Sequence, residues 1–243
     1  MIVLFTDFGL DDPYTGQMEG VLYAEAPGTP VVRLFSRVPD FNIHAGGYLL
    51  PAYSRGFPAG TVFLCVVDPG VGGARRPVAL QADGCWFVGP DNGLFTMVAR
   101  RGSRCEWWHI TWRPERLSSS FHGRDLFAPV AARLARGEAP LGERFEPAAC
   151  DMVTWPEELF EVVYIDHYGN AMTGLRGHAL DCSERLVVKG RELVHAGTFQ
   201  DVPTGEAFWY VNANGLVEIA ANQASAAELL TLSVGSGFTC VTG

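Results

Sequence analysis

A run of apolar residues from Thr61 to Val67 constrains the fold of this chain more than any other segment. It does not alternate between apolar and polar residues, which is typical of a strand covered on both faces inside a parallel sheet. Ile2–Thr6 and Val31–Phe35 predict two further strands, and Pro13–Ala26 and Asn42–Ser54 have the spacing of helices. This alternation of strands and helices predicts an α/β domain.

The same pattern continues to about residue 137 and favours a sheet that is largely parallel. Three more strands are expected at Pro77–Gln81, Trp86–Val88 and Cys105–Thr111. Two more helices are expected at Gly93–Ala99 and Leu126–Arg136.

The composition changes beyond residue 137, where three prolines interrupt a stretch with little periodicity. We expect an N-terminal α/β domain at residues 1–150, a linker at 151–156 and a smaller C-terminal domain at 157–243. In the last of these, short apolar segments separated by Gly, Asn and Asp turns predict an all-β domain, barrel-like or a sandwich. The strands expected there are Glu161–Ile165, Arg185–Val188, Arg191–Val194, Ala207–Val211, Leu216–Ala220 and Leu229–Val234.

Composition and charge limit the classes of function. With 243 residues, 48% of them hydrophobic, and a mean hydropathy of +0.10, the chain can bury one large core or two modest ones. A net charge of −9 and the lack of a Lys/Arg run argue against nucleic acid as a partner. No apolar stretch approaches the ~20 residues that span a bilayer, and the six cysteines form no CxxC pair. We therefore expect a protein of the reducing cytoplasm that does not bind membranes.

Three strand-like segments are followed by a carboxylate. Asp68 comes directly after the apolar run, a Pro/Gly turn exposes it, and Arg75 is close enough in the sequence to hold it. Asp7 and Asp91 follow two other strands in the same way. Because ligands of open α/β sheets lie beyond the carboxyl ends of the strands, we expect Asp7 and Asp68 to share a cleft. The ordinary alternative for any one of these acids is a turn former or a helix cap.

His122 lies on a glycine-bearing turn, Phe121–Asp125, just before an expected helix. An imidazole that joins a fixed carboxylate is typical of proton-transfer chemistry, so we interpret the chain as an enzyme. The other five histidines lack such surroundings and are interpreted as ordinary residues. Asp11 and Asp12 lie near Asp7, but no phosphate-binding loop accompanies them, so no metal is predicted.

Two turns in the second half of the chain allow a structural interpretation. Asp166–Asn170 has an acid and an amide at its ends and a glycine between them, as in a hairpin corner. Asn212–Gly215 is interpreted as a type I′ hairpin turn, because Asn-Gly suits positive φ.

Six motifs occur together in the order found in the S-adenosyl-L-methionine hydroxide adenosyltransferases, the water-using relatives of the fluorinase and chlorinase. They extend from Thr6 to about Ala227, and each is weak when taken alone. They are Thr6-Asp7-Phe8-Gly9, Asp68-Pro69-Gly70-Val71-Gly72 with Arg75, Pro90-Asp91-Asn92-Gly93, Phe121-His122-Gly123-Arg124-Asp125, Asp166–Asn170 and Glu218–Ala227. The chain therefore resembles this family along almost its whole length.

This resemblance implies that water or hydroxide attacks C5′ of S-adenosyl-L-methionine and gives adenosine and methionine, with no cofactor besides this substrate. It also implies a homotrimer, with each site between the N-terminal domain of one subunit and the C-terminal domain of a neighbour. By matching position, Asp68, Arg75 and His122 are the catalytic triad. Arg75 would fix Asp68, and His122 would bind the water or relay its proton, while the residue that takes the proton stays open.

The resemblance also implies which residues bind the substrate. They are Asp7 and Phe41 at the ribose with Phe8 beside Asp7, Phe199 on the adenine, Asp166 at the methionine ammonium, Asn170 at the adenine edge, and Asn222 and Gln223 where the backbone meets adenine. One departure is Ala213, which stands where relatives often have a serine that helps to hold the methionine part.

Two alternative functions come from different classes. Halide transfer to C5′ is disfavoured, because the halogenating relatives have a tyrosine at the position of Asp68 and a carboxylate repels a halide. A sensor that binds S-adenosyl-L-methionine or adenosine without turnover is disfavoured because binding alone does not require the triad.

Overall fold

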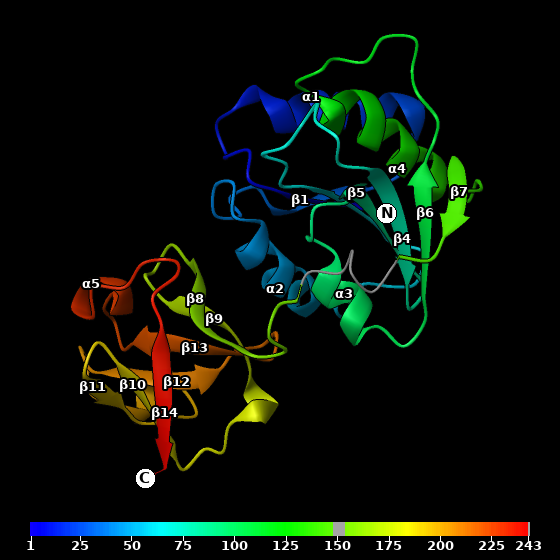
Figure 1. Cartoon of the computed structure of the whole chain (residues 1–243). Helices are drawn as coiled ribbons and strands as arrows, with labels where there is room; N and C mark the ends of the chain where they lie inside the picture. Colours follow the sequence, from blue (N-terminus) through cyan, green and yellow to red (C-terminus); the bar gives the residue numbers. More distant parts are fainter. Residues whose placement is uncertain (148–153, 243) are drawn as a thin grey trace. The chain divides into compact units, whose positions relative to one another are not determined.

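A computed structural model describes residues 1–147 and 154–242 of the chain. The chain divides into two compact units, Met1–Thr154 and Trp155–Gly243 (Figure 1). Residues 151–153 of the expected linker lie outside the described residues, so the linker stays a prediction.

The first unit contains a seven-stranded sheet in the order β2-β1-β3-β5-β4-β6-β7. Parallel ladders join β1 to β2 and β3, and β3 to β5, whereas β4 and β7 run against their neighbours. The expected α/β domain with mostly parallel strands is confirmed. The strands are β1 (Ile2–Thr6), β2 (Val31–Phe35), β3 (Val62–Val66), β4 (Pro77–Ala82), β5 (Cys85–Pro90), β6 (Cys105–Ile110) and β7 (Gly142–Phe145).

Helices cover both faces of this sheet, with α1 and α4 on one side and α2 and α3 on the other (Figure 1). Leu4 and Leu64 pack with Leu22 of α1 in one core, and Gly46 of α2 lies close to the Phe5 ring on the opposite face. Both faces of β1 and β3 are therefore buried, as their uninterrupted apolar sequences predict. The helices are α1 (Pro13–Glu25), α2 (Ile43–Ser54), α3 (Thr96–Arg101), α4 (Ala128–Ala135) and the π-helical turn η1 (Gly123–Phe127).

The π-helical turn differs from the single helix expected over Leu126–Arg136. The Ala128 N–H donates to the Gly123 carbonyl, five residues back, and closes the wide turn. Pro129 follows and has no N–H, so it does not continue the α-helical hydrogen bonds into this turn. The helix consequently begins with the residues that follow His122.

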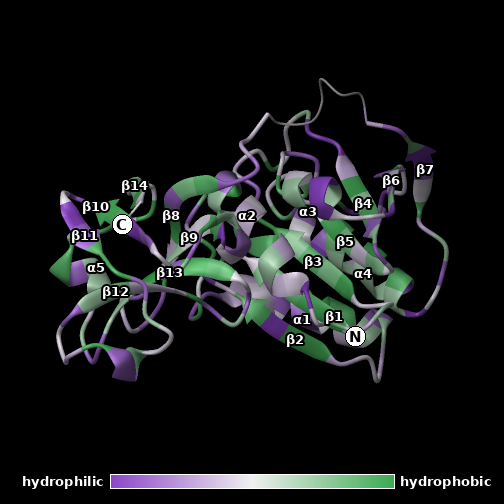
Figure 2. Cartoon of the chain, turned by 90° about the horizontal axis from the view of Figure 1, so that it is seen from below, coloured by the Kyte–Doolittle hydropathy of each residue, from purple (hydrophilic) through white to green (hydrophobic). Residues whose placement is uncertain are grey.

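The second unit contains two antiparallel sheets, β12-β13-β9-β8 and β11-β10-β14, which pack on a shared apolar core. Figure 2 shows β3 of the first unit and β13 of the second as mostly hydrophobic ribbons. The expected all-β domain is confirmed, and no closed barrel forms among residues 154–242. Its elements are β8 (Leu159–Ile165), β9 (Ala171–Arg176), η2 (Gly177–Ala179), β10 (Glu184–Val188), β11 (Arg191–Leu193), η3 (Phe199–Asp201), β12 (Ala207–Val211), β13 (Leu216–Ala221), α5 (Ala226–Leu229) and β14 (Phe238–Thr242).

Two local predictions for the second unit are wrong. The strand expected at Leu229–Val234 is replaced by the end of α5 and a turn, because the Ser225 side chain caps this helix by accepting from the Glu228 N–H at 3.1 Å. The loop between β12 and β13 is not a type I′ turn. Gly215 alone has positive φ in it, and Asn212 N–H donates to the Leu216 carbonyl, which fits a three-residue loop.

Gly89 of β5 lies too close to β3 to carry a side chain. A Cβ atom there would overlap the backbone carbonyl of Cys65. We expect Gly89→Ala to lower the free energy of unfolding, measured by urea denaturation, by about 1–3 kcal/mol. Gly20→Ala on the exposed side of α1, where an added methyl meets nothing within 4 Å, is the control and should raise it by about 0.5–1 kcal/mol. Equal effects of the two substitutions would contradict the close approach at Gly89.

Candidate active site

Asp68, Arg75 and His122 form one hydrogen-bonded cluster in the first unit. Arg75 Nε lies 3.1 Å from each carboxylate oxygen of Asp68, and Arg75 Nη2 lies 2.5 Å from Oδ2. The same Nη2 lies 2.8 Å from Nδ1 of His122. The side chains of Arg75 and Asp68 are only 10% and 4% exposed, so the ion pair is largely shielded from solvent. The structure thus brings His122 into contact with the Asp68–Arg75 pair, although 47 residues separate His122 from Arg75.

The end of β3 and the turn after it place Asp68. Asn92 Nδ2 donates to the Val67 carbonyl at 2.8 Å and secures this end of the strand. Gly72 has φ +77°, and a Cβ atom there would overlap the Ser119 carbonyl. A glycine is therefore needed where the turn that carries Asp68 meets the loop that leads to His122.

The contact with Arg75 determines the protonation of His122. A guanidinium has only N–H donors, so Nδ1 of His122 must be an acceptor. The neutral ring then carries its proton on Nε2. Burial lowers the pKa of His122, and the positive charge of Arg75 lowers it further, so the neutral ring is favoured.

A cavity of about 820 Å³ opens next to this cluster within the first unit. Four of the predicted site residues line it: Asp7, Phe8, Phe41 and Asp68. Asp7 Oδ2 accepts the Phe41 N–H at 3.0 Å, and Phe41 has φ +59° and is 74% exposed. Burial raises the pKa of the Asp7 carboxyl, and Asp40 and Asp68 raise it further. The expectation that Asp7 and Asp68 share a cleft is met.

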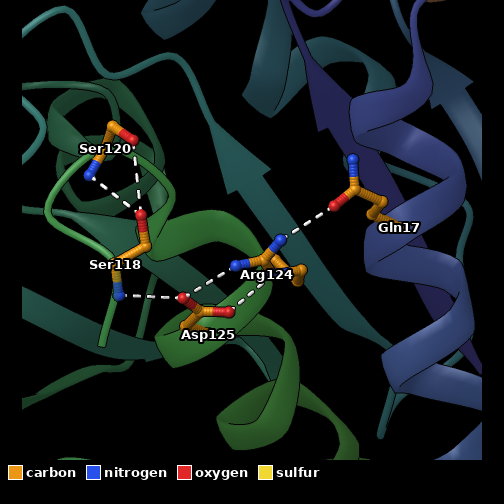
Figure 3. A network of polar contacts seen from close by, with 5 residues as sticks. All are labelled: Gln17, Ser118, Ser120, Arg124 and Asp125. Carbon is orange, nitrogen blue, oxygen red and sulfur yellow. Dashed lines mark hydrogen bonds and ion pairs between the residues drawn. The ribbon is translucent and has the colours of Figure 1, made fainter. Parts of the chain in front are cut away.

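Sequence reasoning missed Gln17, Ser118, Ser120 and Arg124, which also line the cavity. Together with Asp125 they form the network drawn in Figure 3. Arg124 donates to both Asp125 oxygens, at 2.6 and 3.1 Å, and to Gln17 Oε1 at 2.8 Å. Asp125 Oδ2 accepts the Ser118 N–H at 2.9 Å, and Ser118 and Ser120 bond to each other. The network ties the loop before His122 to α1 and η1. The sequence feature that could have predicted this network is the Arg-Asp pair that follows His122.

Asp91, the third acid expected after a strand, does not join the cluster. Its carboxylate pairs with Arg76 at 3.2 Å, at the edge where β4 and β5 meet. A position after a strand was therefore not sufficient to identify a site residue.

The other predicted binding residues lie in the second unit. The Asp166 carboxylate accepts from the Tyr168 and Asn170 N–H groups, both at 2.9 Å, and from Asn170 Nδ2 at 3.0 Å. Phe199 of η3 packs edge to face on Phe208 and Tyr210. Asn222 Nδ2 donates to the Val202 carbonyl, Gln223 has φ +53°, and Ala213 lies in the β12–β13 loop. Their roles in binding stay predictions.

Within residues 1–147 and 154–242, no three His, Cys, Asp or Glu side chains gather in a way that would hold a metal ion. No helix there is both long and apolar enough to cross a bilayer.

Two family models match the chain: the SAM hydroxide adenosyltransferase N-terminal domain over residues 2–143 and the C-terminal domain over residues 160–239. A protein of Salinispora arenicola named (R)-S-adenosyl-L-methionine hydrolase is 39% identical, with 98% of this chain and 96% of that protein covered. One of the same name from Thermus thermophilus is 38% identical, with 96% of each covered. A fluorinase of Nocardia brasiliensis is more distant, at 26% identity, with 97% of this chain and 94% of the fluorinase covered.

A solved structure is also similar along the whole chain. It is described as an uncharacterized conserved protein from Thermotoga maritima. The match has a TM-score of 0.90 and 31% sequence identity, and covers 99% of both chains.

The hydrogen bond between Arg75 and His122 predicts one tautomer. In long-range ¹H–¹⁵N correlation spectra, we expect His122 to be the neutral Nε2–H form at pH 7.5 and to titrate with a pKa below the ordinary value of about 6.5. Arg75→Gln removes a charge that lowers this pKa, so the pKa should rise in that variant. An Nδ1–H tautomer, or a pKa above 6.5 in the unsubstituted protein, would contradict the geometry.

Proposed function

The chain belongs to the SAM hydroxide adenosyltransferase family, and from this membership we propose that it is an enzyme that hydrolyses S-adenosyl-L-methionine to adenosine and L-methionine. The observation that carries the proposal is the hydrogen-bonded cluster of Asp68, Arg75 and His122 next to the cavity that Asp7 also lines. The cavity, about 820 Å³, is in the range of small-molecule sites.

The reaction requires activation of the nucleophile but not of the leaving group. A sulfonium leaves with the electron pair of the C5′–S bond as a neutral thioether, so no acid has to protonate it. Neutral water is a poor nucleophile towards a saturated carbon, and the site must hold one water in line with the C5′–S bond as the C5′–O bond forms. Orientation and removal of the water proton are therefore the tasks of the protein.

The cluster divides these tasks between two groups. His122 offers an Nε2–H donor, because Arg75 already occupies Nδ1, so the ring orients the water and does not take its proton. Asp68 takes the proton. Its carboxylate offers about four acceptor positions, and the contacts with Arg75 leave room on Oδ1. Arg75 fixes both partners at once.

The substrate-binding roles follow from the family resemblance. Asp7 holds the ribose hydroxyls with the acceptor positions that the Phe41 N–H leaves open, and Phe8 and Phe41 border the ribose. In the second unit, Phe199 stacks on adenine, Asn170 with the backbone at Asn222 and Gln223 binds its edge, and Asp166 binds the ammonium. Ala213 supplies no hydroxyl to the methionine part, which leaves that end to Asp166 and the backbone.

The names of the relatives add the configuration at sulfur. The relatives from Salinispora arenicola and Thermus thermophilus are named for the (R) epimer of S-adenosyl-L-methionine. A sulfonium is pyramidal, and its two epimers exchange the positions of the methyl group and the lone pair. A site that anchors both ribose and ammonium therefore favours one epimer for in-line attack, and we propose the (R) epimer as the substrate.

The assembly and location are proposed on the resemblance and on cysteine chemistry. We propose a homotrimer with sites at subunit interfaces, as the family resemblance implies. A reducing cytoplasm suits the free thiols of Cys65, Cys85, Cys105, Cys182 and Cys240.

Hydrolysis by attack at C5′ predicts where oxygen from water goes. In ¹⁸O-water, the (R) epimer should give adenosine with one ¹⁸O at the 5′ position and unlabelled methionine, measured by mass spectrometry. The (S) epimer, assayed in parallel, should react more slowly. Unlabelled adenosine, or no adenosine from either epimer, would refute attack by water, and a 5′-halogenated nucleoside in chloride or fluoride buffer would favour halide transfer.

Removal of the proton acceptor should slow the chemical step. We expect Asp68→Asn to lower kcat by about 10²–10⁴-fold while calorimetry still detects adenosine binding. Asp91→Asn is the matched control, because Asp91 also follows a strand but pairs with Arg76, and its kcat should not change. Adenosine binding without turnover in the unsubstituted protein would identify a sensor, and full activity of Asp68→Asn would exclude Asp68 as the acceptor.

A further inference from the structure

The second unit buries a carboxylate that the proposed mechanism does not use. Glu218 lies in the middle of β13 and is only 3% exposed. Its neighbours Val217 and Ile219 point into the apolar core between the sheets, so Glu218 points to the opposite face. Tyr210 lies directly across from it on β12 and shares that face.

Two side chains satisfy this carboxylate. The Tyr210 hydroxyl donates to Oε1 at 2.7 Å, and Asn212 Nδ2 donates to Oε2 at 2.8 Å. The orientation of the Asn212 amide is determined independently, because its Oδ1 accepts the N–H groups of Asn214 and Leu216 at 3.0 and 3.1 Å. Its NH₂ group therefore faces Glu218, and Oε2 of Glu218 accepts this hydrogen bond.

Each partner of Glu218 leads to an element with a proposed role in binding. The Tyr210 ring contacts the Phe199 ring with centroids 5.5 Å apart, edge to face. Asn212 holds the loop that contains Ala213 through its two bonds to the backbone. Glu218 thus joins the residue proposed to stack on adenine to the loop proposed to border the methionine part.

Burying a carboxylate in a β-sheet costs free energy. Among the residues that the structure describes, no Lys, Arg or His forms an ion pair with Glu218. Burial raises the pKa of its carboxyl, and only the two neutral donors act against this, while Asp166 raises it further. An apolar residue would fill the same position at lower free-energy cost, so its hydrogen bonds serve more than the stability of the sheet.

We infer that Glu218 is a positioning residue for substrate recognition, which orients Phe199 through Tyr210 and the Ala213 loop through Asn212. This inference rests on the proposed function. Glu218 does not touch the reacting atoms, so its loss should affect binding and leave the chemical step intact. The two partners should also affect different parts of the substrate: Tyr210 the adenosine part, and Asn212 the methionine part.

The experiment compares Glu218→Ala, Tyr210→Phe and Asn212→Ala in the full-length protein. Calorimetry measures adenosine binding, and steady-state assays with S-adenosyl-L-methionine measure KM and kcat. We expect Glu218→Ala to raise both the adenosine Kd and KM by roughly tenfold with kcat within about twofold. Tyr210→Phe should weaken adenosine binding, whereas Asn212→Ala should raise KM and leave adenosine binding unchanged.

Glu192→Gln on β11 is the control, because this exposed glutamate pairs with Arg185 in the other sheet and should change none of these values. Thermal unfolding separates a structural role from a positioning role. A lowered Tm with unchanged Kd and KM, or a fall in kcat at unchanged KM, would overturn the inference. If the unsubstituted protein fails to hydrolyse S-adenosyl-L-methionine but binds adenosine, the proposed function fails while the adenosine measurements still test Glu218.

Discussion

The contact of one guanidinium with a carboxylate and an imidazole is the interaction on which the candidate active site depends. Arg75 has only donors, so it holds Asp68 as an acceptor and His122 through its unprotonated Nδ1. The parts that bring these residues together come from separate segments. They are the end of β3, a turn whose glycine lies against the Ser119 carbonyl, and a loop anchored by Arg124 and Asp125.

The charges of the site suit a cationic substrate and a neutral nucleophile. The cavity is lined by more acidic than basic side chains: Asp7, Asp12, Asp40 and Asp68 against Arg37 and Arg124. Arg75 balances Asp68 and Asp125 balances Arg124, which leaves an excess of negative charge. The cavity therefore attracts a sulfonium, while a neutral His122 next to it adds no positive charge that would repel the substrate. In the proposed reaction, the carboxylate of Asp68 would also favour water over a halide as the nucleophile.

The sequence predicted those features that arise locally, and missed those that depend on distant contacts. The strands β1 and β2 were predicted to the residue, since short and mostly apolar segments leave few alternatives. The short strands β7, β9 and β14 were missed, because their stability comes from pairing with neighbours and not from their own pattern. Asp68 and Arg75 were associated by their spacing, and His122, 47 residues beyond Arg75, was proposed as their partner because of its glycine-bearing turn, while the family resemblance supplied the roles of the three residues. Glu218 looked like an ordinary strand residue, because burial and hydrogen bonds are not visible in the sequence.

The raised pKa values of two acids show that parts of the proposed site lower the stability of the fold. Burial raises the pKa of Asp7 and of Glu218, so the folded state binds their protons more tightly than the unfolded chain does. Each of these carboxylates therefore destabilises the fold at neutral pH, and this cost is relieved as the pH falls through the raised pKa. The effect of Asp125 on stability has the opposite sign. Its bond to Arg124 lowers its pKa, so Asp125 stabilises the fold at neutral pH and this contribution is lost at acid pH. Stability alone would favour more pairs like Asp125 with Arg124, so the acids Asp7 and Glu218 are better explained by the proposed recognition of the substrate than by the fold.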